Sequence, residues 1–188
     1  MLILALAAAP LVAQIPQTPE DLIARNLGPR DQVNKAFPPH KIIGNVYYVG
    51  SQALGTFLIT TPEGHILINS DYEVTVPVIK AGVEQLGFKF TDIKILLISH
   101  AHWDHDAGSA MVKRLTGAQY MVMDGDVPVV ETGGKLDFHY GAMVATHYPV
   151  AKVDRVLHDG DEVKLGNVTL VARLTAGQIG RASCRERV

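Results

Sequence analysis

The sequence predicts an α/β domain built on a mixed β-sheet. Apolar runs at residues 42–49, 56–60 and 65–69, separated by short turns, predict an antiparallel β-meander. From residue 74 onward, segments with helical periodicity alternate with strand-like segments, which is typical of β-α-β units and predicts a mixed sheet. The strand predicted at residues 94–99 is followed at once by ligand-type side chains, in the position where α/β proteins usually bind their ligands.

The other elements follow from the same patterns. Apolar residues near helical spacing predict a helix over residues 74–86, which Gly87 ends, and a second helix over 107–115, which Gly117 ends. Residues 132–149 are expected to be mostly loop. The remaining predicted elements are a strand at 119–123, a short amphipathic helix at 124–131, and strands at 153–157, 162–165 and 168–174.

Length and composition limit the possible functions. The 188 residues suffice for one domain with a core, and 47% of them are hydrophobic while 19% are charged, which indicates a globular protein. A formal net charge of −2 gives no electrostatic footprint for nucleic acid. The single cysteine, Cys184, argues against a disulfide framework and a thiol nucleophile. Ser51 and Ser109 do not lie in a G-x-S-x-G motif, so a serine nucleophile is not expected.

The start of the chain predicts export. Residues 1–13 are apolar, rich in leucine and alanine, and end at a small residue, yet they are too short to span a bilayer. We interpret them as the remnant of a secretory signal peptide, with an apolar first helix of the mature fold as the alternative. Residues 14–40 contain five prolines and are expected to form an arm with at most one short helix.

The motif HAHWDH at residues 100–105 places three histidines and an aspartate at the end of the predicted strand 94–99. His100 and His102 can aim their rings the same way on an extended backbone, and Asp104 and His105 follow where the loop enters a helix. Imidazole nitrogen and carboxylate oxygen suit zinc, so each pair could begin a separate metal centre. The alternative is a surface loop that is merely rich in histidine.

These residues resemble a known family. HAHWDH matches the H-x-H-x-D-H signature of the metallo-β-lactamase superfamily, which also contains thioesterases, lactonases and nucleases. The surrounding segments look like the third subclass of class B β-lactamases, and the resemblance runs over residues 42–177. The segments that carry it are 64–70, 86–88, 92–99, 120–124 and 133–140.

The resemblance implies a four-layer αβ/βα sandwich, of which residues 14–177 would contain the first half and the start of the second. It implies two zinc ions per full-length chain. His100 and His102 would bind the first ion, and Asp104 and His105 the second. Asp104 would also act in catalysis by orienting a metal-bound hydroxide that attacks the β-lactam carbonyl. The alternative reaction is hydrolysis of a thioester or a lactone by the same fold.

Two residues outside the motif, Asn69 and His139, also bear on this scheme. Asn69 stands where many members of the superfamily carry an aspartate that supports the metal loop, and it could equally be a plain cap at the end of a strand. His139 lies in a segment that the subclass shares, and we expect a structural role for it near the site.

The expected partner is a small β-lactam. The same resemblance, with the predicted signal peptide, implies a periplasmic protein that contributes to antibiotic resistance. No nucleic acid and, after signal removal, no membrane is expected to bind. A monomer is the expected form, although the sequence does not determine the oligomeric state.

The end of the chain departs from the family pattern. After Thr175, Ala176 and Gly177, Gln178 stands where the subclass carries the histidine that completes the first zinc site. Residues 178–188 resemble the translation of a common sequencing adapter, so we expect a C-terminally truncated domain followed by a non-native tail. The alternative is a genuine divergent terminus. With part of the zinc ligands missing, the 188-residue chain is expected to be an inactive fragment.

Overall fold

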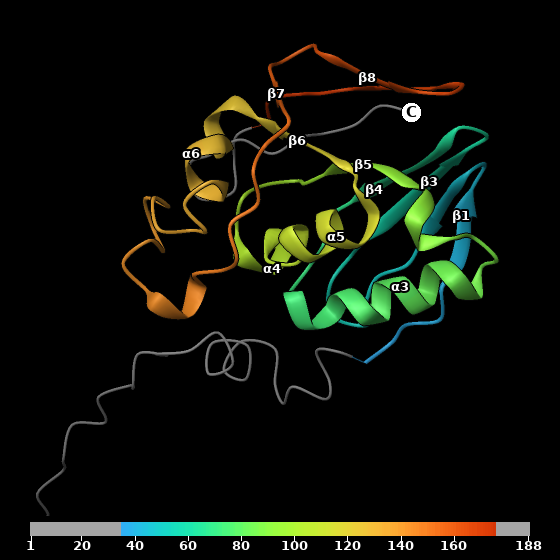
Figure 1. Ribbon diagram of the computed structural model, residues 1–188, viewed down its shortest axis with the longest axis horizontal. Helices are drawn as coiled ribbons and strands as arrows, with labels where there is room; N and C mark the ends of the chain where they lie inside the picture. The colour runs from blue at the N-terminus through green and yellow to red at the C-terminus, as the bar shows by residue number, and fades with distance from the viewer. Residues whose placement is uncertain (1–34, 176–188) are drawn as a thin grey trace, which may run out of the picture.

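Seven strands form one mixed sheet in the computed structural model, which describes residues 35–175 (Figure 1). The strands are neighbours in chain order. Strands β1 to β4 pair antiparallel, and β4 to β7 pair parallel. The predicted mixed sheet is therefore confirmed. The strands are β1 (His40–Ile43), β2 (Val46–Tyr48), β3 (Phe57–Thr61), β4 (Gly64–Ile68), β5 (Ile93–Leu97), β6 (Gln119–Met123) and β7 (Arg155–Leu157).

The prediction of one strand over residues 42–49 is wrong, because the chain folds back within it. β1 and β2 form an antiparallel hairpin in which Ile43 lies opposite Val46. Gly44 has φ +53, a left-handed conformation that glycine adopts without steric cost. The side chain of Asn45 fixes the turn, since its Nδ2 donates a hydrogen bond to the Thr60 carbonyl at 2.7 Å.

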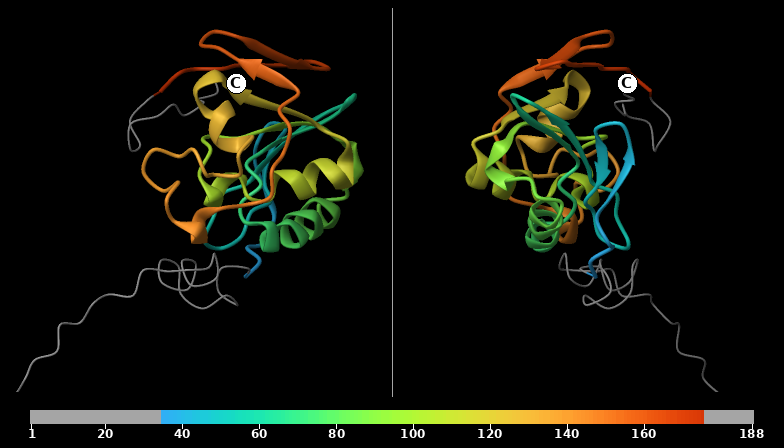
Figure 2. Two further views of the ribbon diagram at one scale, coloured as in Figure 1. Left: turned by 60° about the vertical axis from the view of Figure 1, so that its left-hand side comes forward. Right: turned by 90° about the vertical axis from the view of Figure 1, so that its right-hand side faces the viewer.

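Side chains of the central strands alternate between two buried faces. Leu58, Leu67 and Leu96 face the core on one side, where α3 (Val76–Gln85) and α5 (Ser109–Thr116) cover the sheet. These helices confirm the two predicted ones in outline. Figures 1 and 2 show them together on this side of the sheet. Burial on both faces explains the nearly continuous apolar runs of these strands.

A second, two-stranded sheet covers the opposite face. β8 (Glu162–Leu165) and β9 (Val168–Val171) form an antiparallel hairpin, shown at the top of Figure 1. Val163 and Leu170 of the hairpin pack in one buried cluster with Ile66 and Ile95 of the main sheet. The described residues thus form three of the four expected layers. None of their helices is long and apolar enough to cross a membrane.

The connection after β5 is where the site is built. The helix predicted at 107–115 is present as α5, which begins at Ser109, and a separate short helix, α4 (Trp103–Asp106), precedes it, so Asp104 and His105 are helical residues. The predicted helix at 124–131 is present as η3 (Asp124–Asp126) and α6 (Val127–Val130), and residues 132–149 are mostly loop, as predicted. The other helical turns are η1 (Glu73–Thr75), η2 (Phe90–Asp92) and η4 (Val144–Thr146).

Gly108, between α4 and α5, lies against the chain that leaves β4. Its N–H donates a hydrogen bond to the Asp71 carbonyl at 2.9 Å. A Cβ at this position would lie 2.4 Å from the Ser70 carbonyl oxygen and 2.6 Å from Val76 Cγ2. Glycine at position 108 therefore allows the segment between α4 and α5 to contact the chain that leaves β4. The proposed signal peptide at residues 1–13 and the tail at 178–188 lie outside the described residues.

We expect Gly108→Ala to lower the free energy of unfolding by about 1–3 kcal/mol, because the new methyl group overpacks this contact. Gly125→Ala is the matched control, since its Cβ would meet nothing within 4 Å, and its effect should stay below about 0.5 kcal/mol. Urea unfolding followed by circular dichroism measures both values. Equal effects of the two substitutions would contradict the close contact.

Candidate metal centre

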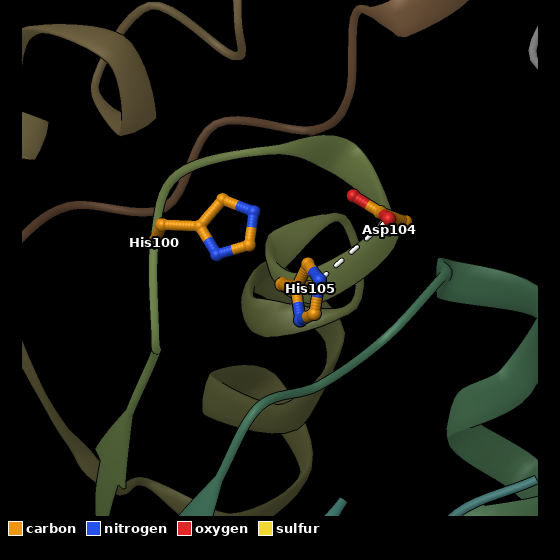
Figure 3. Close-up of side chains that lie close together, drawn as sticks. All are labelled: His100, Asp104 and His105. Atoms are coloured by element: carbon orange, nitrogen blue, oxygen red, sulfur yellow. Dashed lines mark ion pairs between the residues drawn. The ribbon is translucent and has the colours of Figure 1, made fainter. Parts of the chain in front are cut away.

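The structure brings the four predicted ligand residues together beyond the carboxyl end of β5. His100 lies on the loop after the strand, His102 directly precedes α4, and Asp104 and His105 belong to α4. One ligand atom from each of His100, Asp104 and His105 lies within 4.8 Å of the others, as Figure 3 shows. The centroid of the His102 ring lies 4.6 Å from that of His100. Such a group of nitrogen and oxygen atoms could hold a metal ion.

Burial keeps two of these histidines neutral. Burial, with smaller contributions from the His105 and His102 rings, lowers the pKa of His100 to about 3. Burial and the His102 ring lower the pKa of His105 to about 4. Each ring therefore has a nitrogen lone pair that no proton occupies at neutral pH. Burial also raises the pKa of Asp104, and the neighbouring His100 opposes that rise.

The Nε2 atom of His100 fits a metal ligand. This atom is buried, and no hydrogen-bond partner lies near it in the described part of the chain. The other ring nitrogen, Nδ1, lies 3.2 Å from Ser99 Oγ. Buried polar atoms are rarely left without a partner, and a metal ion bound by Nε2 would provide one. The residues present thus suit a zinc ion.

Asp137 orients His102, a contact that the sequence did not reveal. Its Oδ2 lies 3.4 Å from His102 Nε2, and both side chains are largely buried. Its Oδ1 accepts hydrogen bonds from the N–H groups of His139 and Tyr140 at 2.8 and 2.6 Å. A carboxylate on one ring nitrogen is the usual partner of a metal-binding histidine. Nδ1, the other ring nitrogen of His102, does not take part in this contact and could bind an ion.

His139 itself lies on the surface near the site. Its ring stacks edge-on against Tyr140 with a centroid distance of 4.5 Å. Tyr140 in turn contacts the rings of His102 and Trp103, at centroid distances of 5.1 and 5.0 Å. His139 therefore contacts the residues around the histidine cluster without belonging to it.

Asn69 links the ends of β4 and β5. Its Oδ1 accepts a hydrogen bond from the Ser99 N–H at 2.8 Å, and its Nδ2 donates one to the Gly55 carbonyl at 3.2 Å. Its φ of +66 is a left-handed value that asparagine tolerates better than most residues. The side chain thus caps the strand end and also holds the loop that carries His100, so both of the expected roles apply.

Two further carboxylates, Asp71 and Asp106, are buried near the candidate metal centre. Burial raises the pKa of Asp71 to about 7, and the Thr56 hydroxyl opposes this rise. Burial also raises the pKa of Asp106 to about 7. Among the described residues, the only ion pairs that Asp104 and Asp137 make are with histidines, and neither Asp71 nor Asp106 pairs with a lysine or arginine. A bound cation would therefore favour the charged form of these carboxylates.

A separate cleft lies between the main sheet and the β8–β9 hairpin. It has a volume of about 620 Å³ and is lined by residues that include Lys94, Gln119 and Arg155. None of its lining residues belongs to the histidine cluster. This cleft is therefore distinct from the candidate metal centre.

Comparison with known proteins agrees with this geometry. The family model of the metallo-beta-lactamase superfamily matches residues 56–177. The metallo-β-lactamase FEZ-1 from Legionella gormanii is 55% identical, with a TM-score of 0.77, and the match covers 79% of this chain and 57% of that one.

Two other solved structures carry the subclass in their descriptions. LRA-12, a class B3 di-zinc metallo-β-lactamase from an Alaskan soil metagenome, is 37% identical with a TM-score of 0.76, and the match covers 81% of this chain and 57% of that one. BJP-1, a subclass B3 enzyme of Bradyrhizobium japonicum, is 35% identical with a TM-score of 0.74, over 81% and 57% of the two chains.

The match spans a little more than half the length of each of these structures. Their fold agrees with the mixed sheet and the helices described above. The resemblance to the third subclass is confirmed by the two structures named as B3. Because the family model covers more than half of its residues, the chain belongs to the metallo-β-lactamase superfamily.

Proposed function

We propose that the full-length gene product is a zinc-dependent hydrolase that opens the amide bond of β-lactam antibiotics. The observation that carries this proposal is the group of a buried His100 with the half-buried Asp104 and His105, in which His100 Nε2 has no partner within the described residues. The solved relatives with 35–55% identity are named as β-lactamases, which supports the substrate class.

The chain's own residues suggest how two zinc ions would be held. His100 and His102 would bind one ion, and Asp104 and His105 the other. Zinc in such a set acidifies water to a pKa near 7 and polarises a carbonyl group. In this scheme an oxygen of Asp104 would accept a hydrogen bond from the attacking water and so orient it. Asp137 would keep the His102 ring aligned through Nε2.

Aromatic side chains form one wall beside the proposed zinc ligands. Tyr140 packs edge-on against both His102 and Trp103, and the Tyr148 hydroxyl donates a hydrogen bond to the Ala101 carbonyl at 2.7 Å. These side chains would offer an apolar surface to a bound substrate. We also propose export to the periplasm, where β-lactams would reach the enzyme, on the basis of residues 1–13 alone.

We expect the purified full-length gene product to hydrolyse nitrocefin, to lose this activity on treatment with a chelator, and to regain it with zinc. His100→Ala and Asp104→Ala should each lower kcat/KM by more than about 100-fold, because several kcal/mol of charge stabilisation is lost with the metal. His158→Ala, in an exposed turn before β8, is the control and should leave the activity unchanged. A zinc-loaded protein that is inert to β-lactams and cleaves a thioester or lactone would support the alternative reaction.

Asp137→Asn should weaken zinc binding by about 10–100-fold, the usual effect of removing the partner of a metal-binding histidine. The asparagine keeps the Oδ1 acceptor for the N–H groups of His139 and Tyr140, so the loop should stay folded. Competition with a chromophoric chelator measures the affinity. Asp124→Asn, whose aspartate Oδ1 accepts the Gly125 N–H in an exposed turn, is the matched control. Equal affinities of the two variants would exclude the orienting role of Asp137.

A further inference from the structure

A buried polar network lies directly beneath α4. Asp106, at the end of this helix, is fully buried, and its Oδ1 accepts hydrogen bonds from the hydroxyls of Ser109 on α5 and Tyr120 on β6, each at 2.5 Å. Ser70, after β4, adds a further member, because its Oγ lies 2.9 Å from that of Ser109. The Ser109 hydroxyl donates to Asp106, and the Ser70 hydroxyl lies within hydrogen-bond distance of both Ser109 Oγ and the His105 carbonyl. The network thus connects four segments of the fold.

The same network reaches the backbone of a proposed zinc ligand. The N–H of Ser70 donates a hydrogen bond to the His105 carbonyl at 2.9 Å, and Ser70 Oγ lies 3.3 Å from the same oxygen. On the other side, Asp106 follows His105 directly in the chain. His105 is therefore held from two directions, by the segment after β4 and by the residue that anchors the end of α4.

External support is needed because α4 is very short. It contains four residues, Trp103–Asp106, and a helix of this length is not stable by itself in water. The N–H groups of His105 and Asp106 both bond to the His102 carbonyl at 3.0 Å, so few internal hydrogen bonds define the turn. The direction in which Asp104 and His105 point consequently depends on what holds this turn against the sheet.

A buried carboxylate is an unusual residue at a position whose role is only structural. No lysine or arginine pairs with Asp106 within the described residues, and its Oδ2 has no hydrogen-bond partner there. Removing a charged group from water is costly, so a buried carboxylate without a cationic partner calls for an explanation. What the carboxylate adds is direction, since it accepts two hydrogen bonds from fixed hydroxyls and so sets the rotation of α4.

We propose that Asp106 is a positioning residue of the metal centre. Through Ser109, Tyr120 and Ser70 it fixes α4 so that Asp104 and His105 hold their ligand geometry before a metal ion arrives. This inference rests on the proposed zinc function. It assigns to Asp106 no contact with the ion or the substrate.

The test compares zinc binding by variants of the full-length gene product. Tyr120→Phe removes one hydroxyl from the network, and Asp106→Asn keeps an oxygen that can accept both hydrogen bonds. Asp106→Ala removes the acceptor altogether. We expect Tyr120→Phe and Asp106→Ala to weaken the binding of one of the two zinc ions by about 10–100-fold, with Asp106→Asn recovering most of the affinity.

A spectroscopic readout separates positioning from stability. The cobalt-substituted Tyr120→Phe and Asp106→Ala proteins should show altered ligand-field bands, while circular dichroism and thermal melting of the metal-free forms report how far each variant is folded. Tyr47→Phe is the matched control, because Tyr47 lies on β2, packs against the same helix-side core and is remote from β6 in the sheet. It should leave both the zinc affinity and the cobalt spectrum unchanged.

Two results would count against the inference in different ways. If Tyr120→Phe and Asp106→Ala melt at lower temperature but bind zinc and cobalt as the unaltered protein does, Asp106 serves only the stability of the core and the inference is wrong. If the unaltered protein takes up no zinc at all, the proposed function fails and the role of Asp106 fails with it.

Discussion

This region of the molecule depends on the burial of the proposed zinc ligands. Not every polar atom of these side chains has a hydrogen-bond partner within the described residues. A buried polar atom without a partner costs about 1–3 kcal/mol. Within residues 35–175, His100 Nε2 is such an atom, and the burial of Asp104 also opposes the charge of its carboxylate. The sheet can hold this arrangement because hydrogen bonds connect the ends of β4 and β5. Asn69 makes them, with the backbone of Leu97 and of Ser99. A bound dication would satisfy the ring nitrogen and offset the negative charge.

The sequence predicted most of the fold because its central strands and helices have clear periodicity. Burial on both faces makes the strands of the main sheet recognisable as short apolar runs, and Gly117 ended a helix as expected. The hairpin formed by β1 and β2 was not predicted, because the apolar residues on both sides of its turn resemble one continuous strand. The Gly44–Asn45 pair was the available signal, since glycine at positive φ followed by asparagine is typical of tight hairpin turns.

The candidate site was predictable only where its residues are contiguous. The HAHWDH motif lies within one connection, so its spacing alone indicated a shared metal site. Asp137 comes from the loop after α6, and no spacing rule relates that loop to His102. Asp106 lies next to the motif, yet its role depends on Tyr120 of the neighbouring strand, which only the packing of β6 beside β5 brings near. Long-range contacts of this kind arise from tertiary structure and leave no local pattern.

The central claim is that histidine nitrogen and aspartate oxygen of this one connection bind zinc. X-ray absorption at the zinc K edge, on the zinc-loaded full-length gene product, tests it most directly. The account predicts nitrogen and oxygen ligands at about 2.0–2.2 Å, together with the outer-shell scattering of imidazole rings. A sulfur ligand at about 2.3 Å, or a shell of oxygen atoms without imidazole, would contradict the account.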